Sequence, residues 1–119
     1  MEKSVLTKRD ARAQFTRSLE SSDLLLLDMP STLFHNVRIL LMNILYRFGP
    51  VDFRELKHDL KLTAGNLASH IRALKEAGYI QEHKEIVKAR PRTSYQLTEK
   101  GVGAFKDFKK SMVEVLRDE

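Results

Sequence analysis

The stretch that decides the fold is VDFRELKHDLKLTAGNLASHIRALKEAGYI, residues 51–80. It holds two candidates for helix N-caps. Asp52 is followed three places later by Glu55, the acidic form of a capping box, and Thr63 can cap a second helix. That second helix ends at Gly78, because glycine tolerates the left-handed backbone that closes many helices. A short helix, a tight link and a second helix together predict a helix-turn-helix.

Both helices carry a narrow apolar edge at the three-and-four spacing of an α-helix. These edges can pack on a longer amphipathic helix, predicted between Pro30-Ser31-Thr32 and Gly49-Pro50. The apolar positions are Leu33, Val37, Leu40, Leu41, Ile44, Leu45 and Phe48 in the long helix, Phe53, Leu56 and Leu60 in the short one, and Leu67, Ile71 and Leu74 in the last.

The residues after Gly78 predict a β-hairpin with a basic tip. β-formers and charged residues run from Tyr79 through Val87, and a second, alternating stretch runs from Thr93 to Leu97. Residues 88–92 (KARPR) form the connection between the two strands.

A last helix follows the hairpin, with Thr98 as its N-cap. Gly101 and Gly103 each weaken its start by about 1 kcal/mol relative to alanine. One face of this helix is apolar, and it either closes the core of one subunit or pairs with a second copy; both can hold. The residues of this face are Phe105, Phe108, Met112 and Val115.

The N-terminal arm, residues 1–29, carries as many acidic as basic residues. A helix is predicted over 7–20, and its apolar face includes Phe15 and Leu19. We expect these two side chains to join the dimer contact of the C-terminal helix.

The order of the elements is helix, short helix, tight turn, helix, basic hairpin, helix. It predicts a mainly α protein with a small β-hairpin (α+β), a winged helix-turn-helix with N- and C-terminal helices for dimerisation. We divide the chain into the arm (1–29), the winged helix-turn-helix domain (30–98) and the C-terminal helix (99–119).

The side of the second motif helix opposite its apolar edge suits a DNA groove. Asn66 can pair with adenine, and Arg72 with guanine or a phosphate. Thr63 and the helix N-terminus can hold a phosphate oxygen. Plain solvent exposure is the alternative for the small polar residues. The candidate DNA contacts of this helix are Thr63, Gly65, Asn66, Ser69, His70 and Arg72.

The hairpin tip offers a second DNA contact. Arg90 and Arg92 flank Pro91, which stiffens the tip, and an arginine there can enter a narrow minor groove. Lys84 and Lys88 can follow the adjacent phosphates. The alternative is a solubilising loop.

The charge distribution favours a polyanion as partner. The chain of 119 residues has 21 Lys and Arg against 16 Asp and Glu, a net charge of +5. Between Lys61 and Arg92, seven basic residues face three acidic ones, so most of the excess lies in the motif and hairpin.

The composition also excludes several kinds of chemistry. There is no cysteine, so thiol catalysis, thiolate metal sites and disulfides are excluded. No phosphate-binding glycine loop or hydrolase motif is present, and we expect neither an enzyme nor a cofactor. No metal site is expected either, because no two of the four histidines have helical i, i+4 spacing. The histidines are His35, His58, His70 and His83.

No stretch of the sequence is long and apolar enough for a membrane span. The longest apolar run is the four leucines 24–27, and the N-terminus lacks the apolar region of a signal peptide. We therefore expect a cytoplasmic protein with no membrane partner.

Three segments carry a resemblance to a known family. HNVRILLMNIL (35–45), the stretch 51–80 and KEIVKARPRTSYQLTEKG (84–101) resemble small MarR- and ArsR-like winged-helix transcriptional regulators of prokaryotes. The resemblance implies a homodimer, with recognition helix 63–77 in the major groove and wing 79–97 on the backbone or minor groove. ArsR-like metal sensors bind their metal with Cys or His/Asp clusters. Since this chain has no cysteine, the resemblance does not imply a metal site here.

We therefore predict a homodimeric, sequence-specific double-stranded DNA-binding transcriptional regulator that acts as a repressor. The alternative is a winged-helix module that binds another protein and has no specific DNA binding. The DNA-binding regulator could also respond to a small-molecule effector held between the terminal helices and the winged domain. The sequence does not identify such an effector.

Overall fold

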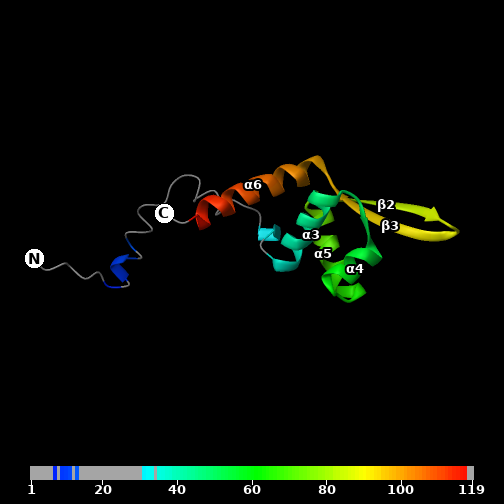
Figure 1. The fold of residues 1–119 in the computed structure, drawn as a ribbon, viewed down its shortest axis with the longest axis horizontal. Helices are drawn as coiled ribbons and strands as arrows, with labels where there is room; N and C mark the ends of the chain where they lie inside the picture. The colour runs from blue at the N-terminus through cyan, green and yellow to red at the C-terminus, as the bar shows by residue number, and fades with distance from the viewer. Residues whose placement is uncertain (1–6, 8, 12, 14–30, 34, 118–119) are drawn as a thin grey trace, which may run out of the picture.

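The computed structural model describes residues 7, 9–11, 13, 31–33 and 35–117. The predicted α+β winged helix-turn-helix is confirmed (Figure 1). The candidate dimer residues Phe15 and Leu19 lie outside the described residues. The elements in chain order are η2 (Ser31–Leu33), α3 (Asn36–Phe48), β1 (Val51–Asp52), α4 (Phe53–Leu60), α5 (Ala64–Glu76), β2 (Ile80–Val87), β3 (Arg90–Leu97) and α6 (Glu99–Leu116).

The helix boundaries follow from local chemistry, but the predicted start of the long helix is wrong. Residues Ser31–Leu33 form the separate turn η2, and α3 begins at Asn36 with His35 as its cap, whose Nδ1 accepts the Val37 N–H at 3.2 Å. Asp52, Thr63 and Thr98 each accept a hydrogen bond from the backbone N–H three residues further on, at 2.7, 3.2 and 3.0 Å. All three predicted N-caps are therefore confirmed. Gly78 follows α5 with a φ of +80°, the left-handed conformation expected for it.

The helices and the base of the sheet share one hydrophobic core. Leu41, Met42 and Leu45 of α3 point into it, but Leu40 and Phe48 are 52% and 73% exposed. The prediction that these two belong to the packed stripe is wrong. The predicted stripe spans a wider arc than the neighbouring elements cover. Other core residues are Leu56, Leu67, Ile71, Leu74, Tyr79, Ile80, Tyr95, Phe105 and Phe108.

The described strands form one antiparallel sheet in the order β1-β3-β2. The hairpin turns at Lys88 and Ala89, whose φ angles of 52° and 62° indicate a tight two-residue turn. The predicted connection 88–92 is therefore too long, because Arg90, Pro91 and Arg92 already belong to β3. Strand β1 was not predicted, since two residues are too few to show a periodic pattern.

The hairpin projects beyond the helical body as a wing (Figure 1). β1 pairs with β3 only at Ser94 and Tyr95, so the outer part of β3 is bonded to β2 alone. Pro91 lies in that outer part, where the missing backbone N–H of proline is tolerated. Across the described residues, no helix combines the length and apolar character that crossing a membrane would require.

Candidate nucleic-acid interface

Helix α5 buries one side and exposes the other, as its sequence predicts. Leu67, Ile71 and Leu74 are at most 3% exposed. The opposite side carries small, polar and charged residues in contact with solvent. These exposed residues are Gly65, Ser69, Arg72 and Glu76.

The first turn of α5 is also exposed. Thr63 and Asn66 are both accessible, and the Thr63 hydroxyl accepts the Asn66 backbone N–H. The cap therefore satisfies one of the free amides at this helix end. The Asn66 side chain remains on the surface at the end of the helix that carries the positive partial charge.

His70 differs from the other candidates on α5, because it is half-buried against α3. Its Nδ1 accepts a hydrogen bond from Arg38 Nε at 3.2 Å, and its ring lies 4.5 Å from that of His35. Burial, followed by the charges of His35 and Arg38, lowers the pKa of His70. The structure thus places His70 at the contact between two helices rather than on the exposed face of α5.

The wing presents its basic residues in two different states. Lys84, Lys88 and Arg90 are exposed. Arg92 is exposed too, but it forms an ion pair with Asp52, with 3.3 Å between Nε and Oδ2. Since Asp52 also caps α4, this ion pair connects the wing to the first helix of the motif.

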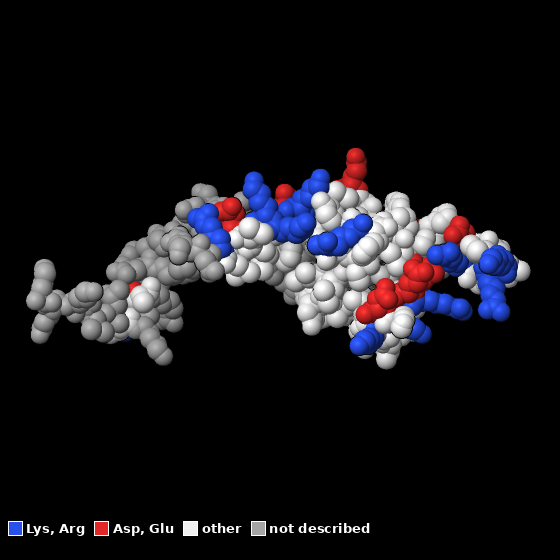
Figure 2. Space-filling view, viewed as in Figure 1, with Lys and Arg blue, Asp and Glu red and all other residues white. Residues whose placement is uncertain are grey.

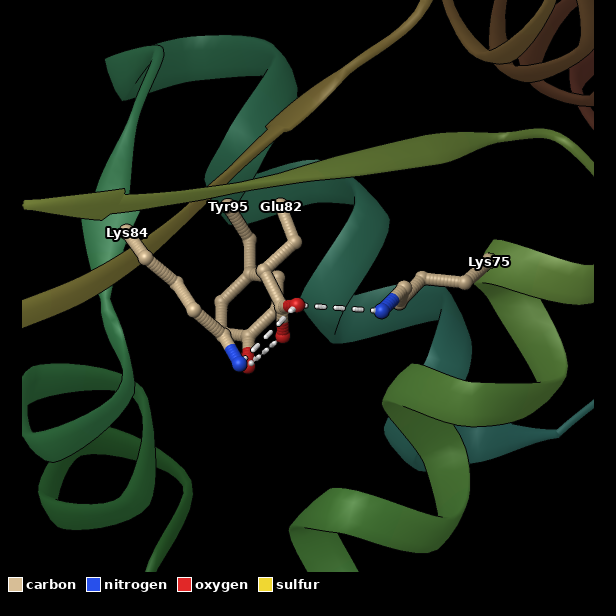
Figure 3. Close-up of polar contacts among 4 residues, drawn as sticks. All are labelled: Lys75, Glu82, Lys84 and Tyr95. Atoms are coloured by element: carbon tan, nitrogen blue, oxygen red, sulfur yellow. Dashed lines mark hydrogen bonds and ion pairs between the residues drawn. The ribbon is translucent and has the colours of Figure 1, made fainter.

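A polar network connects the wing to α5 (Figure 3). Glu82 of β2 accepts hydrogen bonds from the Tyr95 hydroxyl at 2.9 Å and from Lys75 Nζ of α5 at 3.2 Å. Lys84 Nζ lies 4.0 Å from the same carboxylate. The Tyr95 hydrogen bond is the main cause of a lowered Glu82 pKa, and burial is the main cause of a raised Tyr95 pKa. Glu82 is therefore ionised at neutral pH, and it holds the base of the wing beside α5.

Two adjoining hollows lie between the wing and the helix-turn-helix. One, of about 600 Å³, is bordered by the start of α4 and by the outer wing, including Arg54, Lys84 and Arg90. The other, of about 360 Å³, is bordered by Arg72 and Lys75 of α5. The two hollows share the side chains Phe53, Glu82 and Tyr95. Cations of α4, α5 and the wing therefore line one concave surface together with carboxylates. The cations are Arg54, Arg72, Lys75, Lys84, Arg90 and Arg92, and the carboxylates are Asp52, Glu55, Glu76 and Glu82.

Sequence reasoning missed Arg54 and Lys75 as candidate contacts. Arg54 is an exposed residue in the first turn of α4, and Lys75 is on α5. Neither lies on the predicted outer face or at the wing tip. The charge excess between Lys61 and Arg92 includes Lys75, but it does not single out that residue, and it leaves Arg54 out. Figure 2 shows Lys and Arg side chains at the wing, and a second group of them over α6.

The candidate dimer residues of α6 divide into two classes. Phe105 and Phe108 are 3% and 4% exposed in the core of a single chain, whereas Met112 and Val115 are half-buried. The first interpretation of this face, closure of the core, is therefore correct for the two phenylalanines. The outward side of α6 carries other apolar residues, since Val113 and Leu116 are each 67% exposed.

Comparison with known proteins agrees with this geometry. Residues 37–116 match the family model of the winged helix DNA-binding domain. The chain belongs to this family. A transcriptional regulator homologue of Pyrococcus horikoshii has 33% sequence identity and a TM-score of 0.72, covering 79% of this chain and 93% of that one.

Two further proteins extend the comparison. An uncharacterised protein of Methanocaldococcus jannaschii is 38% identical over 72 residues, which cover 60% of this winged-helix chain and 78% of the relative. The S. aureus MepR protein, solved in a complex with DNA, shares the fold at 16% identity and a TM-score of 0.62, covering 87% of this chain and 81% of MepR. The chain is thus a winged-helix DNA-binding protein, and it shares the fold of MepR.

Proposed function

We propose that the protein is a homodimeric, sequence-specific regulator of transcription that binds double-stranded DNA and acts as a repressor. Helix α5 enters the major groove, and the wing lies on the backbone and in the minor groove. One observation carries this proposal: Arg72 of α5 borders one hollow, Lys84 and Arg90 of the wing border the other, and the two hollows share lining residues. The fold shared with MepR, which was solved with DNA, supports the same partner.

The proposed division of labour follows from the side chains. The exposed Ser69 and the small Gly65 let the α5 backbone approach the groove, where Asn66 and Arg72 read base edges. Lys84, Lys88 and Arg90 of the wing, with Arg54 of α4, contact phosphates and position the protein without reading sequence. Arg92 contributes mainly by holding the wing through Asp52.

A second copy of the chain is proposed to cover the outward side of α6. Val113 and Leu116 expose apolar surface there, with the half-buried Met112 and Val115 beside them. Phe105 and Phe108 support this face from inside the core, and the arm residues Phe15 and Leu19 are proposed to join it. In such a dimer each protomer reads one half-site, and the half-site centres are about one helical turn apart.

The function is that of a binding protein and not of an enzyme, and no cofactor is needed for it. A small-molecule effector would act by changing the distance between the two recognition helices.

Selection from a pool of random duplexes tests the proposal. We expect the enriched sequences to contain an inverted repeat, which reports the dimer symmetry. If about four basic residues per protomer meet phosphates, the plot of log affinity against log salt has a slope near −7. A slope near zero, or no enrichment, would contradict the proposal.

A matched pair of charge variants locates the interface. The double substitution Lys84→Ala and Arg90→Ala removes two exposed wing cations, and we expect a flatter salt dependence. The control is Lys106→Ala with Lys110→Ala, which removes the same charge from the exposed surface of α6. Because these lysines share a side of α6 with Val113, light scattering of the control must first show the same oligomeric state as the wild type. If the α6 pair weakens binding as much as the wing pair does, the interface has been placed on the wrong surface.

A further inference from the structure

The outer wing carries an apolar residue that the proposed phosphate contacts do not use. Ile86 is 79% exposed, the most exposed of the large hydrophobic side chains that the structure describes. It lies directly opposite Pro91 in the hairpin register, and Pro91 is also exposed. Residues opposite each other on antiparallel strands point to the same face, so the two form one small apolar patch.

The alternation of the strand determines which way this patch points. Side chains at every second position of β2 lie on one face, so Ile86 shares a face with Glu82 and Lys84. Glu82 on that face reaches Lys75 of α5 at 3.2 Å (Figure 3). The apolar patch is therefore on the side of the wing turned toward the recognition helix.

Cations surround the patch. Lys84 lies two residues before Ile86 on the same face, with Glu82 before it, and Lys88 lies at the turn two residues after Ile86. Arg90 is next to Pro91 but opposite Val87, on the other face; all three cations are exposed. A polyanion drawn to these cations would bring its own less polar surface onto Ile86 and Pro91. In duplex DNA, the surface between the two phosphate rows of the minor groove consists of sugar edges and base edges, and apolar side chains are known to pack there.

We propose that Ile86 and Pro91 form an apolar contact with the deoxyribose walls of the minor groove, between phosphates held by Lys84 and Lys88. The contact adds a part of the affinity that does not depend on salt, because no counterion is released when apolar surface is buried. It rests on the proposed function, since it requires that the wing meets a duplex.

The test uses the duplex that the wild-type protein selects from a random pool, titrated at several salt concentrations. Ile86→Ala should weaken binding by about fivefold to tenfold at every concentration, with the slope of log affinity against log salt unchanged. Arg90→Ala should instead change the slope, by about one for each phosphate that the variant no longer neutralises. His83→Ala is the matched control, because His83 is exposed on the opposite face of the same strand, and it should bind like the wild type.

A second variant separates the apolar contact from strand stability. Ile86→Thr keeps a β-branched side chain, and with it the preference for a strand, but has less apolar surface. It should lose affinity in the same salt-independent way, with an unchanged circular dichroism spectrum.

Three results would overturn the proposal while leaving the proposed function intact. The first is that both Ile86 variants bind DNA with wild-type affinity. The second is that either variant has an altered salt slope. The third is that substitution of Ile86 changes the oligomeric state measured by light scattering. If the wild-type protein selects no duplex at all, the proposed function fails, and this contact fails with it.

Discussion

Two glycines in α6, two residues apart, are expected to respond in opposite directions to the same substitution. The helix crosses the backbone of Tyr79 at Gly101, where an added Cβ would overlap the Tyr79 carbonyl oxygen and lie 2.9 Å from its carbonyl carbon. Around Gly103, nothing lies within 4 Å of the corresponding position. Gly101→Ala should therefore destabilise the protein, and Gly103→Ala should stabilise it.

The magnitudes follow from what each methyl group meets. The Tyr79 backbone cannot move aside easily, because its N–H donates to Leu74 O at 2.9 Å and its carbonyl accepts from Thr98 N at 3.0 Å. The overlap has to be relieved by lifting α6 away from the sheet, and overpacking of this kind costs about 3 kcal/mol or more. At the exposed Gly103, alanine instead gains about 1 kcal/mol of helix propensity.

Urea unfolding, followed by circular dichroism at 222 nm, measures both variants. A difference of about 4 kcal/mol separates their midpoints by about 2 M, for a slope of about 2 kcal/mol per M. If both alanines raise stability, or both lower it by similar amounts, α6 does not cross Tyr79 as closely as described. If both alanines raise stability, the general expectation that each glycine merely weakens the helix is sufficient.

Three other perturbations test the interface and its supports. Asn66→Ala should relax discrimination at one or two base positions by about 1–3 kcal/mol, measured by competition among single-base variants of the selected duplex. An equal loss on every duplex would instead indicate a phosphate contact. Asp52→Ala should lower the free energy of unfolding by about 1–2 kcal/mol, since it removes the cap of α4 and the partner of Arg92; an unchanged urea midpoint would contradict this. The pKa of His70 is lowered from 6.5, so its contribution to stability is complete above pH 6.5 and is lost as the pH falls through the lowered pKa, where the unfolded chain binds more protons. His70→Asn should reduce the difference between the urea midpoints at pH 7.5 and pH 5.5. If the variant shows the same difference as the wild type, His70 is not responsible for the loss of stability at low pH.

Local chemistry allowed much of the fold to be predicted. The caps at Asp52, Thr63 and Thr98 and the stop at Gly78 each depend on residues within one helical turn. The buried edge of α5 follows from helical periodicity alone. The position of the wing in the chain follows from the change of pattern after Gly78. Such features are visible in a sequence because the interacting groups are close along the chain.

Other features depend on which distant segments meet. The width of the packed face of α3, and hence the exposure of Leu40 and Phe48, was set by how much its neighbours cover. The ends of the wing strands were set by pairing across the hairpin and not by the composition of either strand.

The sequence by itself determined the order of the motif helices, the hairpin and the last helix, the three caps at Asp52, Thr63 and Thr98, and the exposed polar side of α5, since each arises from periodicity or from contacts between near neighbours. Only the tertiary structure decided that Arg92 pairs with Asp52, that Glu82 joins the wing to Lys75 of α5, and that His70 faces Arg38. Each of these contacts joins groups on different elements. No local pattern encodes the distance between such groups, and the packing of the core brings them together.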